Sequence, residues 1–274
     1  MTREMIITEL QNRGYNAEAQ TNIKNGVAFE GIRIMTNSNV APVIYTDDIL
    51  RRAEEENRDF DEVVSAIIGI YEANSSLDFD VNELFNREFV LSHLYIGLQK
   101  ESSEELIKRA CEFDGIESYI YIRRDRNEGE SYSVKLNEGI LTRAHITEEE
   151  AWRSAEYNTN RETTIQSMAM VMAELYGMEY SEELEEMTPL YVISNECKVK
   201  GASAVLNKEV LAQFGRKHNT EKIVVLPSSV HEMLLVPYTE EMSLEDFSAM
   251  VSEVNNTEVR PEERLTDRAY IITL

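Results

Sequence analysis

Cysteine, proline and glycine are all scarce in this chain of 274 residues. Its two cysteines, Cys111 and Cys197, stand far apart and form neither a disulfide framework nor the paired spacing of a zinc site. With 5 prolines, 11 glycines and no Gly/Ser-rich linker, the chain offers few flexible joints. We therefore expect a reduced protein whose lobes pack against one another.

Long apolar runs are also missing. The longest segment of this kind, 63-VVSAIIGIY-71, falls far short of the about 20 residues that a membrane-spanning helix needs. The first residues, 1-MTREMIITEL-10, carry charges where a signal peptide has an apolar stretch. These two features predict a cytoplasmic protein with no membrane association.

The common catalytic and nucleotide-binding motifs are absent. The sequence contains no Walker A loop, G-x-G-x-x-G, H-E-x-x-H, G-x-S-x-G or C-x-x-C. The four histidines are too dispersed to suggest a metal site, and His218 falls at an expected helix C-terminus, where a cation would complement the dipole. We therefore expect no cofactor and no metal, and favour a protein that is not an enzyme.

Basic residues are outnumbered by acidic ones, 27 to 51, which gives a net charge of −24. Such a chain repels nucleic acid and anionic membranes as a whole, so nucleic acid is not the expected partner. Only 123-RRDR-126 is locally basic, and Arg123, Arg124 and Arg126 form a weak candidate contact for nucleic acid. The ordinary interpretation of this run is a solvated strand end or loop.

Carboxylates gather in five clusters. Solvated helix faces and N-termini account for them most simply, because helix N-termini favour acidic side chains. Closely spaced carboxylates could also mimic the phosphates of DNA and occupy a basic groove, or bind magnesium, although no spacing supports a magnesium site. The clusters lie at 54–62, 147–150, 179–186, 240–246 and 261–264.

The first third of the chain predicts a helix over 2–13 and then a hairpin. Asn25-Gly26 separates two alternating runs, which is the strongest short signal for a two-residue type I′ turn. An edge strand is expected at 40–46, because Pro42 cannot pair within a sheet. Apolar residues at helical spacing then predict a long helical segment over 47–73, with a break near 54–62.

The middle third predicts strands at 89–99 and 117–124 and a strand pair over 130–146 that turns at 137–139. Two capping boxes, Ser102 with Glu105 and Thr147 with Glu150, predict helices over 102–113 and 148–158. Another helix is expected at 161–176, with Gly177 at its end.

The last third predicts four strands, two helices and a final strand. The strands are expected at 190–195, 198–206, 222–226 and 230–236, with the last strand at 268–273. The helices are expected at 208–218, capped by Asn207, and from Ser243 to about Val254.

Hairpin-like groups of strands alternate with single helices along the whole chain. This order favours an α+β fold with antiparallel or mixed sheets over a regular doubly wound sheet. We expect two to three closely packed lobes, with boundaries that divide the chain into 1–85, 86–188 and 189–274.

The stretch 226-LPSSVHEMLLVP-237 combines serine, histidine and glutamate within a few residues. On a regular strand, Ser229 and His231 would share a face, while Glu232 would point to the opposite one. Pro-Ser-Ser is also an ordinary turn sequence, in which hydroxyls bond nearby backbone groups. The stretch is thus a turn with an ordered histidine, or a binding site formed by Ser228, Ser229, His231, Asn255 and Asn256, with Ser229, His231 and Glu232 as weak catalytic candidates.

Several stretches resemble one known family. They are 25-NGVAFEGIRI-34, 39-NVAPVIYTDDI-49, 147-TEEEAWRSAEYNT-159, 190-LYVISN-195, 201-GASAVL-206, 226-LPSSVHEMLLVP-237 and 253-EVNNTEVRPEERLTDRAY-270. Together they are similar to a family of clostridial proteins from gut Firmicutes that is known only as a domain of unknown function. The resemblance covers nearly the full chain, is weakest over 86–130, implies association with mobile elements, and transfers no activity.

Two functions follow as hypotheses. The first is a non-enzymatic, acidic accessory protein that binds a protein partner with a basic surface, in the interplay of mobile elements or phage with their host. The second is an unrecognised hydrolase or ligand-binding enzyme around Ser229, His231 and Glu232.

Overall fold

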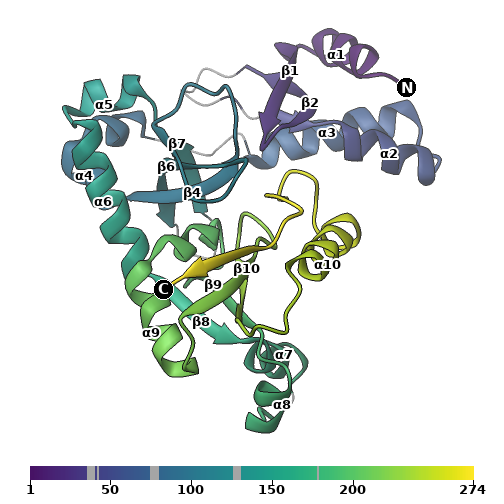
Figure 1. The fold of residues 1–274 in the computed structure, drawn as a ribbon. Helices are drawn as coiled ribbons and strands as arrows, with labels where there is room; N and C mark the ends of the chain where they lie inside the picture. The colour runs from purple at the N-terminus through teal and green to yellow at the C-terminus, as the bar shows by residue number, and fades with distance from the viewer. Residues whose placement is uncertain (36–40, 42, 75–79, 126–130, 178) are drawn as a thin grey trace. The chain divides into compact units, whose positions relative to one another are not determined.

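A computed structural model describes residues 1–35, 41, 43–74, 80–125, 131–177 and 179–274 of the chain (Figure 1). The chain divides into two compact units, Met1–Asn82 and Glu83–Leu274. Helices and three small antiparallel sheets alternate along both units, so the α+β class is confirmed.

The first unit packs helices on a three-stranded sheet. Strands β1 (Ala17–Lys24) and β2 (Val27–Ile34) form the predicted hairpin, in which Asn25 and Gly26 have the positive φ values, 49° and 82°, that a type I′ turn requires. Strand β3 (Val43–Tyr45) pairs with β2 at the edge. Apolar residues of this sheet pack with helices α1 (Arg3–Asn12), α2 (Asp47–Glu55) and α3 (Phe60–Asn74) in one core.

The second unit begins with a short helical region and a four-stranded sheet. A 3₁₀ turn, η1 (Val81–Phe85), starts two residues before this unit and leads to helix α4 (Arg87–Ser92). Strand β6 (Ile116–Asp125) pairs with β4 (Leu94–Lys100), β5 (Lys108–Ala110) and β7 (Ser131–Lys135). Helices α5 (Glu138–Ala144) and α6 (Glu148–Arg161) follow, and α6 lies along β4.

A five-stranded antiparallel sheet forms the rest of the second unit, in the order β12-β10-β11-β9-β8. Its strands are β8 (Thr163–Ser167), β9 (Tyr191–Asn195), β10 (Lys222–Leu226), β11 (Met233–Pro237) and β12 (Tyr270–Thr273). Its helical segments are α7 (Met168–Tyr176), α8 (Glu182–Met187), the 3₁₀ helix η3 (Gly201–Leu206), α9 (Lys208–His218) and α10 (Leu244–Thr257).

One apolar core joins the two sheets of the second unit. Leu98 and Ile116 of the four-stranded sheet pack in the same buried cluster as Ile193, Ile223 and Leu235 of the five-stranded sheet. Strand β8 also pairs with β9 across residues 168–190. The expected boundary at 188 and 189 therefore falls inside this unit.

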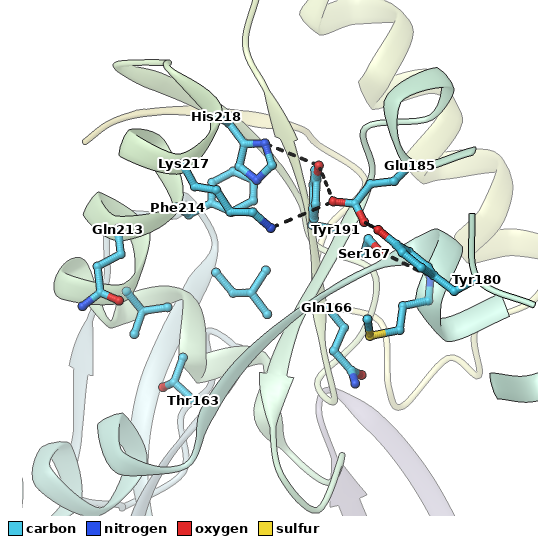
Figure 2. A pocket seen from close by; sticks show the side chains of 13 residues that line it. Thr163, Gln166, Ser167, Tyr180, Glu185, Tyr191, Gln213, Phe214, Lys217 and His218 are labelled. Atoms are coloured by element: carbon cyan, nitrogen blue, oxygen red, sulfur yellow. Dashed lines mark hydrogen bonds and ion pairs between the residues drawn. The ribbon is translucent and has the colours of Figure 1, made fainter. Parts of the chain in front are cut away.

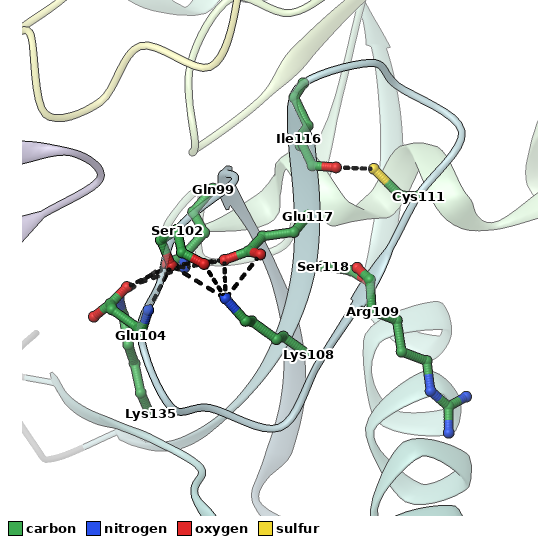
Figure 3. A network of polar contacts seen from close by, with 10 residues as sticks. All are labelled: Gln99, Ser102, Glu104, Lys108, Arg109, Cys111, Ile116, Glu117, Ser118 and Lys135. Atoms are coloured by element: carbon green, nitrogen blue, oxygen red, sulfur yellow. Dashed lines mark hydrogen bonds and ion pairs between the residues drawn. The ribbon is translucent and has the colours of Figure 1, made fainter.

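The expected helix over 102–113 is wrong. Ser102 does not cap a helix; its hydroxyl donates to the carboxylate of Glu117 at 2.8 Å, where Gln99 and Lys108 also bond (Figure 3). Glu117 is only 6% exposed, so its burial depends on these three partners. Strand β5 forms here because it completes the sheet beside β6, a contact that local sequence does not report.

Five other expectations are corrected in part. Residues 87–92 form α4, capped by Asn86, so the strand begins only at Leu94. Asn137 caps helix α5 where a second strand was expected, and β8 replaces the first part of the helix over 161–176. Residues 201–206 are 3₁₀ instead of strand, and β11 begins at Met233 instead of Val230.

Candidate functional site

The Pro-Ser-Ser stretch forms a turn before β11. The backbone N–H of Ser229 donates to the carbonyl of Glu232 at 3.1 Å, and its hydroxyl donates to the Glu232 carboxylate at 3.1 Å. The same hydroxyl accepts the backbone N–H of His231 at 3.0 Å. Ser229 thus bonds the side chain of Glu232 and not the imidazole, unlike the alternation expected for a strand, and Ser228 precedes it in the turn.

His231 connects this turn to two other segments. Its Nδ1 accepts the backbone N–H of Lys200 at 3.2 Å, so the proton of the neutral ring lies on Nε2. Nε2 is 3.5 Å from the carboxylate of Glu263. The imidazole is therefore held by its neighbours in one tautomer and orientation.

Asn255 and Asn256 serve α10 and the segment that follows it. Asn255 is 1% exposed, and its amide donates to the carbonyl of Thr266 and the carboxylate of Asp267 at 3.0 and 2.8 Å. Asn256 accepts from Arg264 at 3.2 Å. The contacts of these two amides thus fix a chain segment.

Two arginines of the basic run, Arg123 and Arg124, are engaged by carboxylates. Arg123 is 6% exposed, lies over the ring of Tyr95 and bonds both carboxylate oxygens of Glu162, at 3.0 and 2.7 Å. It is buried, which corrects the expectation of a solvated strand end. Arg124 pairs with Glu83, and Arg126 lies outside the described residues.

A pocket of about 470 Å³ opens between the edge of the five-stranded sheet and helices α7, α8 and α9 (Figure 2). Strands β8 and β9 supply one wall, and α9 supplies the opposite one. Apolar and polar groups are mixed in its lining, as is usual for ligand pockets. The lining residues are Thr163, Ile165, Gln166, Ser167, Met170, Tyr180, Glu185, Tyr191, Val210, Gln213, Phe214, Lys217 and His218.

Glu185 is the centre of the polar contacts in this pocket. Its carboxylate accepts the hydroxyl of Tyr180 at 2.7 Å on one oxygen and that of Tyr191 at 3.3 Å on the other. Hydrogen bonds from Tyr180 and Ser167 are the main causes that lower the pKa of Glu185. Hydrogen bonding to this carboxylate raises the pKa of Tyr180 to about 12, and burial does the same for Tyr191. Glu185 is therefore a charged acceptor at neutral pH.

His218 extends the same chain of contacts at the end of α9. Its Nδ1 lies 3.4 Å from the Tyr191 hydroxyl, and its ring makes tilted contacts with the rings of Tyr191 and Phe214. Because Tyr191 gives its one proton to Glu185, Nδ1 must be the donor to Tyr191. Burial, and then the charge of Lys217, lower the pKa of His218. The imidazole is thus neutral at pH 7 and is not the dipole-compensating cation that we expected.

Beside this pocket lies an exposed apolar surface on α7, α8 and the segment between them. We call it the α7–α8 surface. Met187, Leu175 and Tyr176 are 82, 72 and 68% exposed, more than any other large apolar side chain among the described residues. Met170 and Tyr180 are exposed and also line the pocket. The surface consists of Met170, Met172, Leu175, Tyr176, Tyr180 and Met187.

All charged residues near this surface in the sequence are acidic. Neither lysine nor arginine occurs between Arg161 and Lys198, while glutamates are frequent. The exposed ones on α7, α8 and the segment between them are Glu174, Glu179, Glu182, Glu183 and Glu186.

Over the described ranges, histidine, cysteine and carboxylate side chains form no group of three that could hold a metal ion. No helix in this part of the chain is long and apolar enough to cross a bilayer.

The fold and its surfaces define an acidic α+β protein with a carboxylate-centred pocket beside an apolar, glutamate-rimmed surface. Residues 2–272 match the model of DUF5688, a family of unknown function, and the chain belongs to this family. No curated protein and no solved structure matches the chain.

Sequence reasoning did not find this pocket. Glu185 lies in the acidic run 179–186, whose sequence predicts a solvated helix face, and Tyr191 lies in a strand without other signals. The missed signal is the absence of basic residues between Arg161 and Lys198, combined with the methionines of α7.

Proposed function

We propose that this protein is a non-enzymatic interaction protein whose α7–α8 surface docks a basic, amphipathic segment of a protein partner. The observation that carries the proposal is that the most exposed apolar side chains lie on α7 and α8, whose own charged residues are all glutamates. Exposed apolar patches with a polar rim are typical of interaction sites. Methionine suits such a site because its flexible, polarisable side chain adapts to different partners.

The charge of the rim selects the chemistry of the partner. A basic segment gains from the glutamates during encounter and after docking, whereas another acidic surface is repelled. A second copy of this chain would bring the same glutamates to the contact, which opposes self-association. An amphipathic helix with lysine or arginine on its polar face can contact the apolar side chains with its apolar face and the glutamates with its basic face.

The proposal also includes the cellular source of the partner. The resemblance to a clostridial family associated with mobile elements makes a cytoplasmic protein of the host or of a phage the natural source of the partner. Such a partner would present a basic surface. Catalysis at Ser229, His231 and Glu232 has less support, because Ser229 bonds Glu232 and His231 Nδ1 accepts a backbone N–H.

A synthetic amphipathic helix of leucine and lysine tests this function by titration calorimetry. We expect the wild-type protein to bind it, and the double variant Leu175→Gln/Met187→Gln to bind at least about tenfold more weakly, since two apolar anchors are lost. Met250→Gln is the matched control, because Met250 is 53% exposed on α10, away from this surface in the sequence.

Two results would contradict the proposal. One is binding of equal strength by the wild type and the double variant. The other is a dimer in sedimentation equilibrium that dissociates on Leu175→Gln/Met187→Gln, because the surface would then serve a second copy.

A further inference from the structure

Glu185 lies in the pocket as a carboxylate with little charge compensation. Its side chain is 17% exposed, and both of its oxygens accept neutral hydroxyl groups. Within the described part of the chain, its one ion pair is with Lys217, whose Nζ is 4.0 Å away and whose side chain is 70% exposed. Such an exposed and distant pair contributes little, so a cation that enters the pocket can replace Lys217 at small cost.

His218 does not supply the missing charge. Its ring is neutral, and its Nδ1 proton is directed to Tyr191. Its Nε2 is buried and makes no hydrogen bond with any described residue. The chain from His218 through Tyr191 to Glu185 therefore orients the carboxylate and leaves its negative charge available to a ligand.

The aromatic and apolar lining suits a lysine side chain. Tyr180 and Tyr191 direct their hydroxyl ends to the carboxylate, and the rings of Tyr180, Tyr191 and Phe214 are part of the pocket lining, where aromatic rings can attract an ammonium group. Ile165 and Met170 offer apolar contact for a methylene stem. A compact ammonium needs one carboxylate oxygen, whereas a planar guanidinium binds best to two, and here a tyrosine already bonds each oxygen.

We infer that this pocket receives the ammonium group of a lysine on the docked partner, with Glu185 as its acceptor and Lys217 as the cation that it displaces. The inference rests on the proposed function, because Met170 and Tyr180 line the pocket and also belong to the α7–α8 surface. The inference thus predicts that one lysine of the basic partner anchors the partner in this pocket.

The probe is capped lysine, Nα-acetyl-lysine methylamide, titrated into the full chain and followed by NMR. We expect saturable shifts of the Tyr180 and Tyr191 ring signals. Glu185→Gln should weaken binding at least about tenfold, because it removes a charge-assisted contact while keeping the side-chain shape. Lys217→Met should strengthen binding, because it removes the competing cation. Capped arginine and the Nε-acetylated form of the probe should bind more weakly than capped lysine.

The leucine–lysine helix separates failure of this inference from failure of the proposed function. If that helix requires Leu175 and Met187 but binds Glu185→Gln as tightly as wild type, the docking function holds and the lysine anchor is refuted. If the helix binds neither the wild-type protein nor Glu185→Gln, the docking function itself fails. Equal binding of capped lysine by wild type and Glu185→Gln, or weaker binding by Lys217→Met, would also overturn the inference. Should Glu185→Gln not fold, Lys217→Met still tests the inference, because tighter binding of capped lysine supports it and weaker binding refutes it.

Discussion

At the scale of single residues, the buried pair of Arg123 and Glu162 should dominate stability. Their side chains are 6 and 12% exposed, and removing one partner of a buried pair leaves the other charge poorly solvated. We expect Glu162→Gln to lower the free energy of unfolding by about 3 kcal/mol in urea denaturation. The control is Glu149→Gln, since Glu149 and Arg153 are 84 and 73% exposed and such pairs contribute at most about 0.5 kcal/mol. Equal losses in both variants would show that Arg123 is stabilised by its other contacts.

Prediction from sequence was also weakest for the contacts of single residues. Ser102 with Glu105 and Thr147 with Glu150 have the same pattern, but only the second pair caps a helix. The hydroxyl of Ser102 instead donates to the buried carboxylate of Glu117 on strand β6. Likewise, Glu185 gains its role from Tyr180, Tyr191 and a pocket wall on α9. These contacts join distant segments, so local spacing cannot report them.

At the scale of elements, the capping box of α6 should make stability depend on pH. Hydrogen bonds from Arg87 and Thr147 lower the pKa of Glu150 to about 2. Because this folded-state pKa lies below the unfolded value of about 4.5, the stabilisation is complete above pH 4.5 and is lost as the pH falls through 2. Glu150→Gln, which still suits a capping box, should therefore show a shallower loss of unfolding free energy between pH 4.5 and 2 than the wild type.

The matched variant for that element is Thr147→Ala. It should lower the unfolding free energy by about 1 kcal/mol at pH 7, because it removes the N-cap acceptor. A pH slope in Glu150→Gln identical to that of the wild type would contradict the role of Glu150.

Elements with strong local signals were predictable. The Asn25-Gly26 hairpin, the caps Thr147, Asn207 and Ser243, and the break between α2 and α3 were all expected from short-range chemistry. The failures occur where tertiary pairing overrides that chemistry. Strand β5 is stabilised by β6, and β8 by β9, whereas η3 replaces a strand where Gly201 packs closely on β9.

At the scale of the whole molecule, the net charge of −24 should give salt opposite effects on folding and on docking. Self-repulsion destabilises the compact chain, and ions screen it within a Debye length of about 10 Å at 0.1 M. We therefore expect the midpoint of thermal unfolding to rise between about 0.01 and 0.5 M NaCl. Over the same range, binding of the leucine–lysine helix should weaken, because the attraction to the glutamate rim is screened. Calorimetric scans and titrations at matched salt concentrations measure both trends. If stability and binding moved in the same direction, the acidic charge would not be the common cause, and the choice of a basic partner would lose its electrostatic basis.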